Sequence, residues 1–353
     1  MKRYLLAGTL IFAALLVSCK KEEDKKEYFD GSGEFTINSK FYSTFYFLPL
    51  EEISVEFDPS GIVVPSEGIT YNWTFSGFYY EGQLIDTLHN GPTSIKLTTP
   101  EQYGTYSITI QPLHDDYYTP TPPILSVVVI DPESKESFRG YADGEFSFID
   151  ERDGVEYPYS RFGDLFWFIT NLRWKTAGVS VDSIAAFDYI FGRLYIWEEA
   201  TGGESREGLG NGPQGVCPTG WSIPTNEDWS NLASYVLGVP TPFEDNWAGM
   251  GEMASAPFYL NDTRLWNVLS PDNLHSNTMQ WNAIPAGNHT PGNLLLPFQN
   301  RDSFGFWWSS SEYSANNANY RFIHYNDNLF RYANGNKVNL GISVRCVKLA
   351  TQP

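Results

Sequence analysis

The chain has 353 residues and carries 42 Asp and Glu against 23 Lys and Arg, which gives a formal net charge of −19 at pH 7. This acidic balance argues against nucleic acid or anionic lipid as the main partner, because both need basic surfaces. The length exceeds one typical hydrophobic core, so two domains are expected. Aromatic residues make up 16% of the chain beside 30 Gly and 22 Pro, a composition that predicts short strands joined by many turns.

The N-terminus has the pattern of an export signal. Lys2 and Arg3 precede an apolar stretch from Leu5 to Val17, whose 13 residues fall short of the roughly 20 that a membrane-spanning helix needs. The sequence Leu-Val-Ser-Cys that ends at Cys19 resembles the lipobox of bacterial lipoproteins. That resemblance implies a signal peptide over 1–18 and an acylated Cys19, whose lipid anchors the protein to the membrane. The alternative is an ordinary signal peptide that contains a cysteine.

Residues 19–32 are predicted to form a flexible tether. From Lys20 to Glu27 every residue is charged, and such a run cannot bury enough apolar surface to offset chain entropy. A lysine followed by acidic residues also resembles the surface-export signal of Bacteroidota-type lipoproteins. The expected location is therefore the outer membrane, with the protein facing the cell surface; a generic spacer facing the periplasm is the alternative. Loss of residues 1–18 lowers the 23 basic residues to 21 and makes the formal charge −21.

Residues 33–131 have β patterns throughout. The segments 53–57, 69–75 and 105–110 alternate apolar and polar residues at the period of two that half-buried strands show. About seven such strands in 100 residues predict an all-β sandwich. Trp73, followed some thirty residues later by Gly104-Thr105-Tyr106, resembles immunoglobulin-like and PKD-like modules. That resemblance implies a core Trp73, a Tyr106 near a tyrosine-corner position, and a spacer role for this domain.

After a polar hinge at 131–137, a second domain of mixed α+β type is predicted over 140–349. Its clearest helix follows Pro224, where Thr225 can cap the first turn and Asp228 can complete a capping box. Gly238 is expected to end this helix. Its buried stripe is predicted to contain Trp229, Leu232, Ala233 and Val236.

Beyond Cys19 the chain has two cysteines, Cys217 and Cys346. In an exported protein two cysteines most simply form one disulfide, and this bond is predicted here. A pair of buried free thiols is the alternative.

A set of motifs in the second domain identifies a family. In this order and spacing they resemble the Fibrobacter succinogenes major paralogous domain. They are Asp150–Tyr157, Phe162–Trp167, Asn171-Leu172, Gly192–Trp197, Val216–Thr225, Pro285–Gly287, Phe306–Ser311 and Ser343–Lys348. The resemblance implies a C-type-lectin-like fold related to the formylglycine-generating-enzyme domain, and it implies no settled activity. Trp167, Trp197, Trp221 and Trp229 are expected in the core.

Several observations argue against an enzyme. The paired reactive cysteines of formylglycine-generating enzymes have no counterpart, and the five histidines (His89, His114, His275, His289 and His324) are scattered rather than spaced for zinc. Glu198, Glu199 and Asp228 are the candidate carboxylates if the domain hydrolyses glycosides. The segment 325–328 offers oxygen ligands for calcium but fits a turn equally well. No catalysis, cofactor or metal is predicted.

A ligand-binding face is predicted instead between Trp307 and Asn336. From Asn316 to Asn339 eight of 24 residues are Asn, mixed with aromatic residues, a combination typical of adaptable binding surfaces. It also resembles the variable region of lectin-fold proteins diversified by retroelements. Because adjacent strand residues point to opposite faces, one of Trp307 and Trp308 is expected to be exposed. The predicted ligand-binding residues are Trp307, Tyr320, His324, Asn326, Asn328, Phe330, Tyr332 and Asn334.

Three functions remain open at this stage. The favoured one is a surface lipoprotein whose lectin-like domain binds an extracellular glycan or protein. The second is a structural subunit, at a fimbrial tip or in an envelope assembly. The third is an enzyme of a type that the motifs do not reveal, for example one that acts on glycans.

Overall fold

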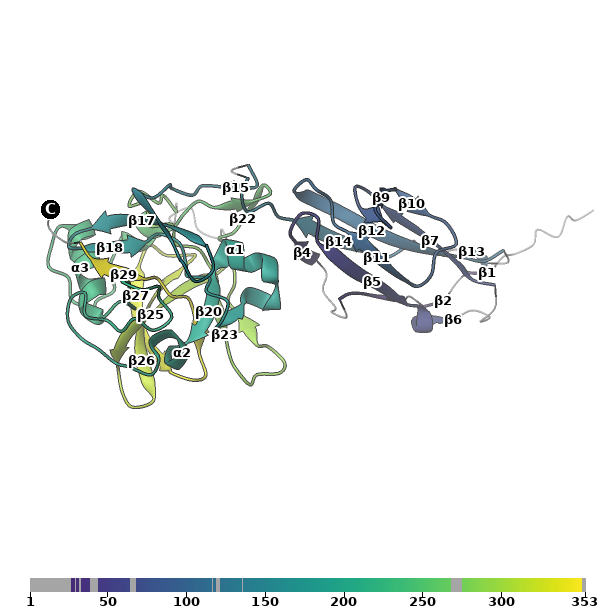
Figure 1. Cartoon of the computed structure of the whole chain (residues 1–353). Helices are drawn as coiled ribbons and strands as arrows, with labels where there is room; N and C mark the ends of the chain where they lie inside the picture. Colours follow the sequence, from purple (N-terminus) through teal and green to yellow (C-terminus); the bar gives the residue numbers. More distant parts are fainter. Residues whose placement is uncertain are drawn as a thin grey trace, which may run out of the picture.

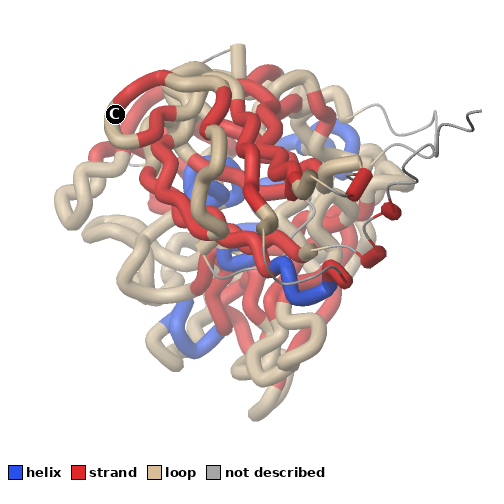
Figure 2. The backbone as a smooth tube through the Cα atoms, turned by 90° about the vertical axis from the view of Figure 1, so that its right-hand side faces the viewer, coloured by secondary structure: helices blue, strands red, loops and turns tan. Residues whose placement is uncertain are grey.

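Two units joined by a short linker make up the part of the chain that the structure describes (Figure 1). A computed structural model places residues 27–28, 30–31, 33–38, 44–63, 68–115, 117–118, 121–134, 136–267 and 275–350. Most of the regular structure is strand, and the helices are short and lie among long loops (Figure 2). The signal segment 1–18, Cys19 and most of the predicted tether lie outside the described residues.

The first unit contains two five-stranded sheets. In spatial order, one has β10 (Thr87–Leu88), β7 (Thr70–Phe75), β12 (Gly104–Leu113), β14 (Ile124–Val129) and β4 (Thr44–Phe47). The other has β3 (Glu34–Ile37), β5 (Glu52–Asp58), β11 (Ser94–Thr98), β8 (Tyr79–Tyr80) and β9 (Gln83–Leu84). Two small pairs, β1 (Glu27–Tyr28) with β13 (Tyr117–Tyr118) and β2 (Asp30–Gly31) with β6 (Ile62–Val63), and a 3-10 turn at Pro59–Gly61 complete it.

Alternation of side chains gives the first unit its core. On β5, Ile53, Val55 and Phe57 are buried while their neighbours are not, as the period-two pattern predicts. They pack in one cluster with residues of the other sheet, among them Trp73, whose indole N–H donates to the carbonyl oxygen of Pro92 at 2.8 Å. The Tyr106 hydroxyl donates to the carbonyl oxygen of Gln102, four residues upstream, at 2.8 Å.

The two units touch directly around the linker. The Tyr46 ring lies 4.7 Å from the Phe187 ring of the second unit, and Ile130 is fully buried in a cluster shared by both units. The Asn261 side chain donates to the carbonyl oxygen of Val129 at 2.8 Å. Apolar burial and a directed hydrogen bond together hold the second unit against the end of the first.

The second unit combines four sheets with short helices, as expected for a mixed domain. In spatial order, the first sheet has β16 (Phe146–Ile149), β17 (Glu156–Phe162), β18 (Leu165–Phe168) and β29 (Val347–Leu349), and the second has β19 (Val179–Ser180), β20 (Arg193–Ile196), β28 (Gly341–Ile342), β23 (Asn288–His289) and β24 (Phe298–Gln299). The third has β25 (Phe304–Glu312), β26 (Asn317–His324) and β27 (Phe330–Asn336). The fourth has β15 (Phe138–Arg139), β21 (Tyr259–Leu260) and β22 (Thr263–Arg264). The helices are α1 (Asp188–Phe191), α2 (Trp197–Thr201), α3 (Asn226–Leu237) and α4 (Met250–Ala254), with 3-10 turns at Val181–Ser183 and Ala185–Phe187.

The predicted helix is confirmed as α3. The Thr225 hydroxyl accepts from the backbone N–H of Asp228, and the Asp228 carboxylate accepts from the backbone N–H of Thr225, which forms the capping box. Gly238 ends the helix with a φ of 71°, a conformation that glycine adopts without strain. Of the predicted stripe, Trp229, Leu232 and Ala233 are buried and Val236 packs against the same cluster.

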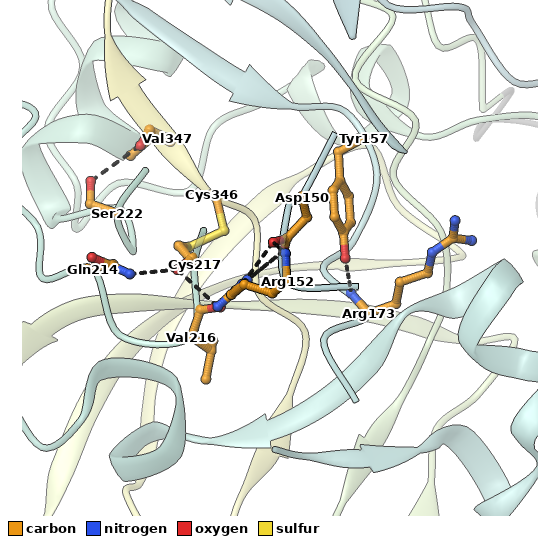
Figure 3. Close-up of a disulfide and its surroundings, with 10 residues drawn as sticks. All are labelled: Asp150, Arg152, Tyr157, Arg173, Gln214, Val216, Cys217, Ser222, Cys346 and Val347. Carbon is orange, nitrogen blue, oxygen red and sulfur yellow. Dashed lines mark hydrogen bonds and ion pairs between the residues drawn. A yellow bond between two sulfur atoms is a disulfide. The ribbon is translucent and has the colours of Figure 1, made fainter. Parts of the chain in front are cut away.

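The C-terminal segment of the second unit is fastened to earlier parts of that unit at two points. Strand β18 pairs antiparallel with β29, with Trp167 opposite Val347. Cys217 and Cys346 form the predicted disulfide (Figure 3), and this prediction is confirmed. Beside the bond, Arg152 donates to the carbonyl oxygen of Val216 at 3.1 Å and pairs with Asp150 at 2.7 Å.

No helix in the part of the chain that the structure describes is long and apolar enough to cross a membrane.

Candidate functional site

The predicted ligand segment folds as the three-stranded sheet β25–β26–β27, in the lower half of the left-hand unit in Figure 1. Antiparallel register decides which side chains share a face, because residues directly opposite each other point the same way. Trp307 lies opposite Arg321, and Phe306 lies opposite Phe322. The sheet therefore has one face that carries Trp307 and another that carries Phe306.

The face that carries Trp307 is the inner face. Trp307 is fully buried, and its indole N–H donates to the Asn171 side-chain oxygen at 2.8 Å. Phe330 lies opposite Ile323 on the same face and is also fully buried, 5.7 Å from the Trp307 ring. The prediction that Trp307 and Phe330 are exposed ligand contacts is therefore wrong.

Trp308 points to the other face and is fully buried as well. Its indole N–H donates to the carbonyl oxygen of Tyr195 at 2.8 Å, because strand β20 covers this end of the sheet. Each tryptophan enters a different apolar cluster of the second unit. The expectation that one of the pair is exposed fails because both faces of β25 are covered at this point.

Further along the outer face the cover ends and a set of aromatic rings is left half-buried. We call Phe304, Phe306, Tyr320, Phe322 and His324 the aromatic face; all five side chains are partly exposed. The rings form a continuous row, with centroids 5.8 Å apart between Tyr320 and Phe306, 5.3 Å between Phe306 and Phe304, and 4.2 Å between Phe304 and His324. Such a row offers a largely aromatic surface that is held in place by the sheet beneath it.

Polar groups border the aromatic face at the turn between β26 and β27. Asn326 and Asn328 are exposed there, as the prediction requires of ligand contacts. Asp327 accepts from the Leu329 backbone N–H at 2.9 Å and pairs with Arg331 at 2.8 Å. Burial lowers the pKa of His324, while the charge of Asp327 opposes that shift. The border of the aromatic face thus combines exposed amide groups with an ion pair.

The remaining predicted contacts lie on the other side of β27. Tyr332 is opposite the buried Arg321 and packs its ring 5.6 Å from that of Phe243. Asn334 accepts from the Asn317 side chain at 3.0 Å. These two residues do not share the face of Tyr320 and His324, so the predicted single face is wrong in this part. The register of β27 against β26 places Tyr332 and Asn334 on the opposite face of the sheet, and alternation along one strand does not give this register.

The carboxylates that were candidates for glycoside hydrolysis lie at helix N-termini. Asp228 is buried, and its two oxygens accept from the backbone N–H groups of Gly210 at 2.6 Å and Thr225 at 2.9 Å. Burial raises the pKa of Asp228 to about 6, and these backbone donors oppose the rise. Glu198 and Glu199 are exposed in the first turn of α2. Among the residues that the structure places, no three His, Cys, Asp or Glu side chains are grouped so as to hold a metal ion.

Sequence reasoning missed most of the aromatic face. Phe304, Phe306 and Phe322 are not among the predicted ligand contacts. The signal was present: Phe304-Gly305-Phe306 alternates at period two, as does Tyr320-Arg321-Phe322. Placing both alternations on one face required the pairing of β25 with β26.

Comparison with known families agrees with the motifs. The family model of the Fibrobacter succinogenes major domain matches residues 161–348, more than half of the chain and most of the predicted 140–349 domain. The core positions expected from these motifs are confirmed, since Trp167, Trp197, Trp221 and Trp229 are all buried. No curated protein matches the chain. The chain belongs to the Fibrobacter succinogenes major domain family.

Proposed function

We propose that this protein is a surface lipoprotein that binds an extracellular glycan or protein through the aromatic face of a C-type-lectin-like domain. The observation that carries the proposal is the row of five partly exposed rings on β25 and β26. Half-buried aromatic rings supply much of the affinity of binding surfaces, because they bury large apolar areas at little entropic cost. Sugar rings present flat C–H faces that stack on such rings, and the amides of Asn326 and Asn328 would bind their hydroxyls.

The first unit acts, in this proposal, as an immunoglobulin-like spacer. Two sheets around one core and the buried Trp73 support that fold, as does the Tyr106 hydroxyl that bonds to backbone four residues upstream, the arrangement of a tyrosine corner. The direct contacts of Tyr46 with Phe187 would hold the binding domain away from the membrane at a set orientation.

Truncation of two rings of the aromatic face should weaken ligand binding. Phe322 and His324 replaced together by Ala should weaken a ligand selected on glycan and host-protein arrays by about 2 kcal/mol or more, the cost of losing a true anchor. Tyr313→Ala is the matched control, because this ring is 59% exposed on the same hairpin but outside the aromatic face. Affinity is measured by calorimetry, with circular dichroism to verify the fold. An unchanged affinity in the folded double variant would refute the site.

One observation favours assembly as a second function. Leu294, Leu295 and Leu296 are 95%, 91% and 62% exposed at the tip of the β23–β24 loop. The loop is ordered by a bond from the Thr290 N–H to the Pro297 carbonyl oxygen, and the Asn293 side chain accepts from two leucine N–H groups. In the same experiment, replacement of the three leucines by Ser should leave the ligand affinity unchanged. Loss of self-association in this variant would favour the assembly subunit.

Lipid attachment at Cys19 is tested separately. Metabolic labelling with a fatty-acid probe should mark the wild-type chain, because the cysteine directly follows the apolar export segment. The Cys19→Ala variant should lose the label and leave the membrane fraction. Label that persists in this variant would place the lipid elsewhere, and protease shaving of intact cells would then report surface exposure independently.

A further inference from the structure

A pocket lies beside the linker, away from the aromatic face. It has a volume of about 290 Å³, at the small end of ligand pockets and suited to a single sugar ring. Its walls come from the linker, the start of β17, the loop after β18 and α1. Three tyrosines, Tyr141, Tyr157 and Tyr189, supply aromatic surface. The pocket therefore combines apolar walls with polar groups from distant parts of the chain.

Arg173 is the one basic side chain among the lining residues that the structure places. Its backbone N–H donates to the Tyr157 hydroxyl at 3.2 Å, while in Figure 3 its guanidinium extends away from the disulfide. The guanidinium lies 5.0 Å from the centre of the Tyr189 ring, which orients it. Within the described residues no carboxylate lies in ion-pair range of Arg173. A half-buried, oriented guanidinium of this kind is a receptor for a carboxylate.

Asp188 supplies an acceptor on another wall. It is 2% exposed; its Oδ2 pairs with Arg193 at 2.7 Å, and its Oδ1 accepts no hydrogen bond within the described part of the chain. A buried acceptor without a donor costs free energy, which a ligand hydroxyl would recover. The Tyr141 hydroxyl likewise makes no hydrogen bond to any residue that the structure places. Glu133 and Glu156 also line the pocket, but both are exposed, so water and salt screen them.

We propose that this pocket binds a small carboxylic acid with several hydroxyl groups, of sugar-acid size, whose carboxylate pairs with Arg173 and one of whose hydroxyls donates to Asp188. The tyrosine rings enclose the apolar face of the ring, and Tyr141 donates to a ligand oxygen. This site is independent of the aromatic face, so either can fail without the other.

Three sugars that differ in one group test the charge of the ligand. The full chain in detergent is titrated by calorimetry with glucuronate, glucose and glucosamine, and with galacturonate and N-acetylneuraminate as further acids. At least one acid should bind about tenfold or more tightly than glucose, the value of a charge-assisted hydrogen bond. The proposal is overturned if glucose binds as well as every acid, if glucosamine binds best, or if no acid saturates the site below about 10 mM.

A pair of variants tests the residue. Arg173→Gln should weaken the best acid about tenfold and leave the binding of glucose unchanged. Lys175→Gln is the matched control, because Lys175 also lies over the Tyr189 ring, at 5.4 Å, but does not line the pocket. Tyr141→Phe, which removes only a hydroxyl, should weaken binding without affecting the melting temperature. Equal losses in Arg173→Gln and Lys175→Gln would show a general charge effect and overturn the assignment.

Discussion

Replacement of Cys217 and Cys346 by alanine should lower the free energy of unfolding by about 5 kcal/mol, the loop-entropy value for a bond that closes so long a segment. The two residues are 129 positions apart, so the disulfide removes much of the freedom of the unfolded family domain. Both are fully buried in the cluster that also holds Trp221 and Trp308. Because domains are stable by only about 5–15 kcal/mol, the variant should be close to unfolding at 37 °C.

Urea unfolding followed by tryptophan fluorescence measures this loss, with wild-type protein reduced before unfolding as the control. The reduced wild type and the double variant should have similar midpoints, both well below that of the oxidised protein. If the double variant unfolds within about 1 kcal/mol of the oxidised wild type, the bond contributes little and the pairing of β18 with β29 is enough to hold the C-terminal segment in place.

Local signals account for the parts of the fold that the sequence predicted well. Helix α3 was predictable because Thr225, Asp228 and Gly238 specify its ends within a few residues of one another. The alternation of Ile53, Val55 and Phe57 likewise specifies which face of β5 is buried. The disulfide followed from the count of two cysteines beyond Cys19, which leaves one pairing between them.

The candidate site could not be predicted in the same way, because it depends on what covers each face of a sheet. Alternation correctly places Trp307 and Trp308 on opposite faces, but only the tertiary structure shows that separate apolar clusters enclose both. The position of Phe330 was decided by its register opposite Ile323. The pocket beside the linker could be predicted even less, because Tyr141, Arg173 and Asp188 come from separate segments that share no sequence pattern.

Arg345→Met should destabilise the family domain by about 3 kcal/mol, because it leaves buried acceptors without donors. The Arg345 side chain is fully buried and, among the described residues, has no carboxylate partner. Its guanidinium donates to the carbonyl oxygens of Trp281 and Asn282 and, at 3.0 Å, to the Asn171 side-chain oxygen. It also lies 3.9 Å from the centre of the Trp281 ring. Methionine fills a similar volume but satisfies none of these oxygens.

Burying the charged guanidinium itself costs free energy, and Arg345→Met removes that cost. The expected destabilisation is therefore smaller than the summed free energies of the separate hydrogen bonds. Burial lowers the pKa of Arg345 to about 9, a sign that the charged form is held at a cost that methionine would remove. Lys348→Met is the matched control, three positions further along the chain. Lys348 is half-exposed and lies 4.5 Å from the Trp221 ring centre, so its loss should cost about 1 kcal/mol or less.

The urea midpoints of the two variants show whether the lost hydrogen bonds outweigh the removed cost of burying the charge. A large shift for Arg345→Met beside a small one for Lys348→Met is the expected result. Asn171 makes the consequence visible elsewhere, because its side-chain oxygen accepts from both Arg345 and the Trp307 indole. Loss of the guanidinium should therefore also alter the fluorescence of buried tryptophan in the folded state. If Arg345→Met is as stable as the wild type, the free-energy cost of burying the cation equals the stabilisation that its hydrogen bonds contribute. In that case the arginine does not stabilise this core.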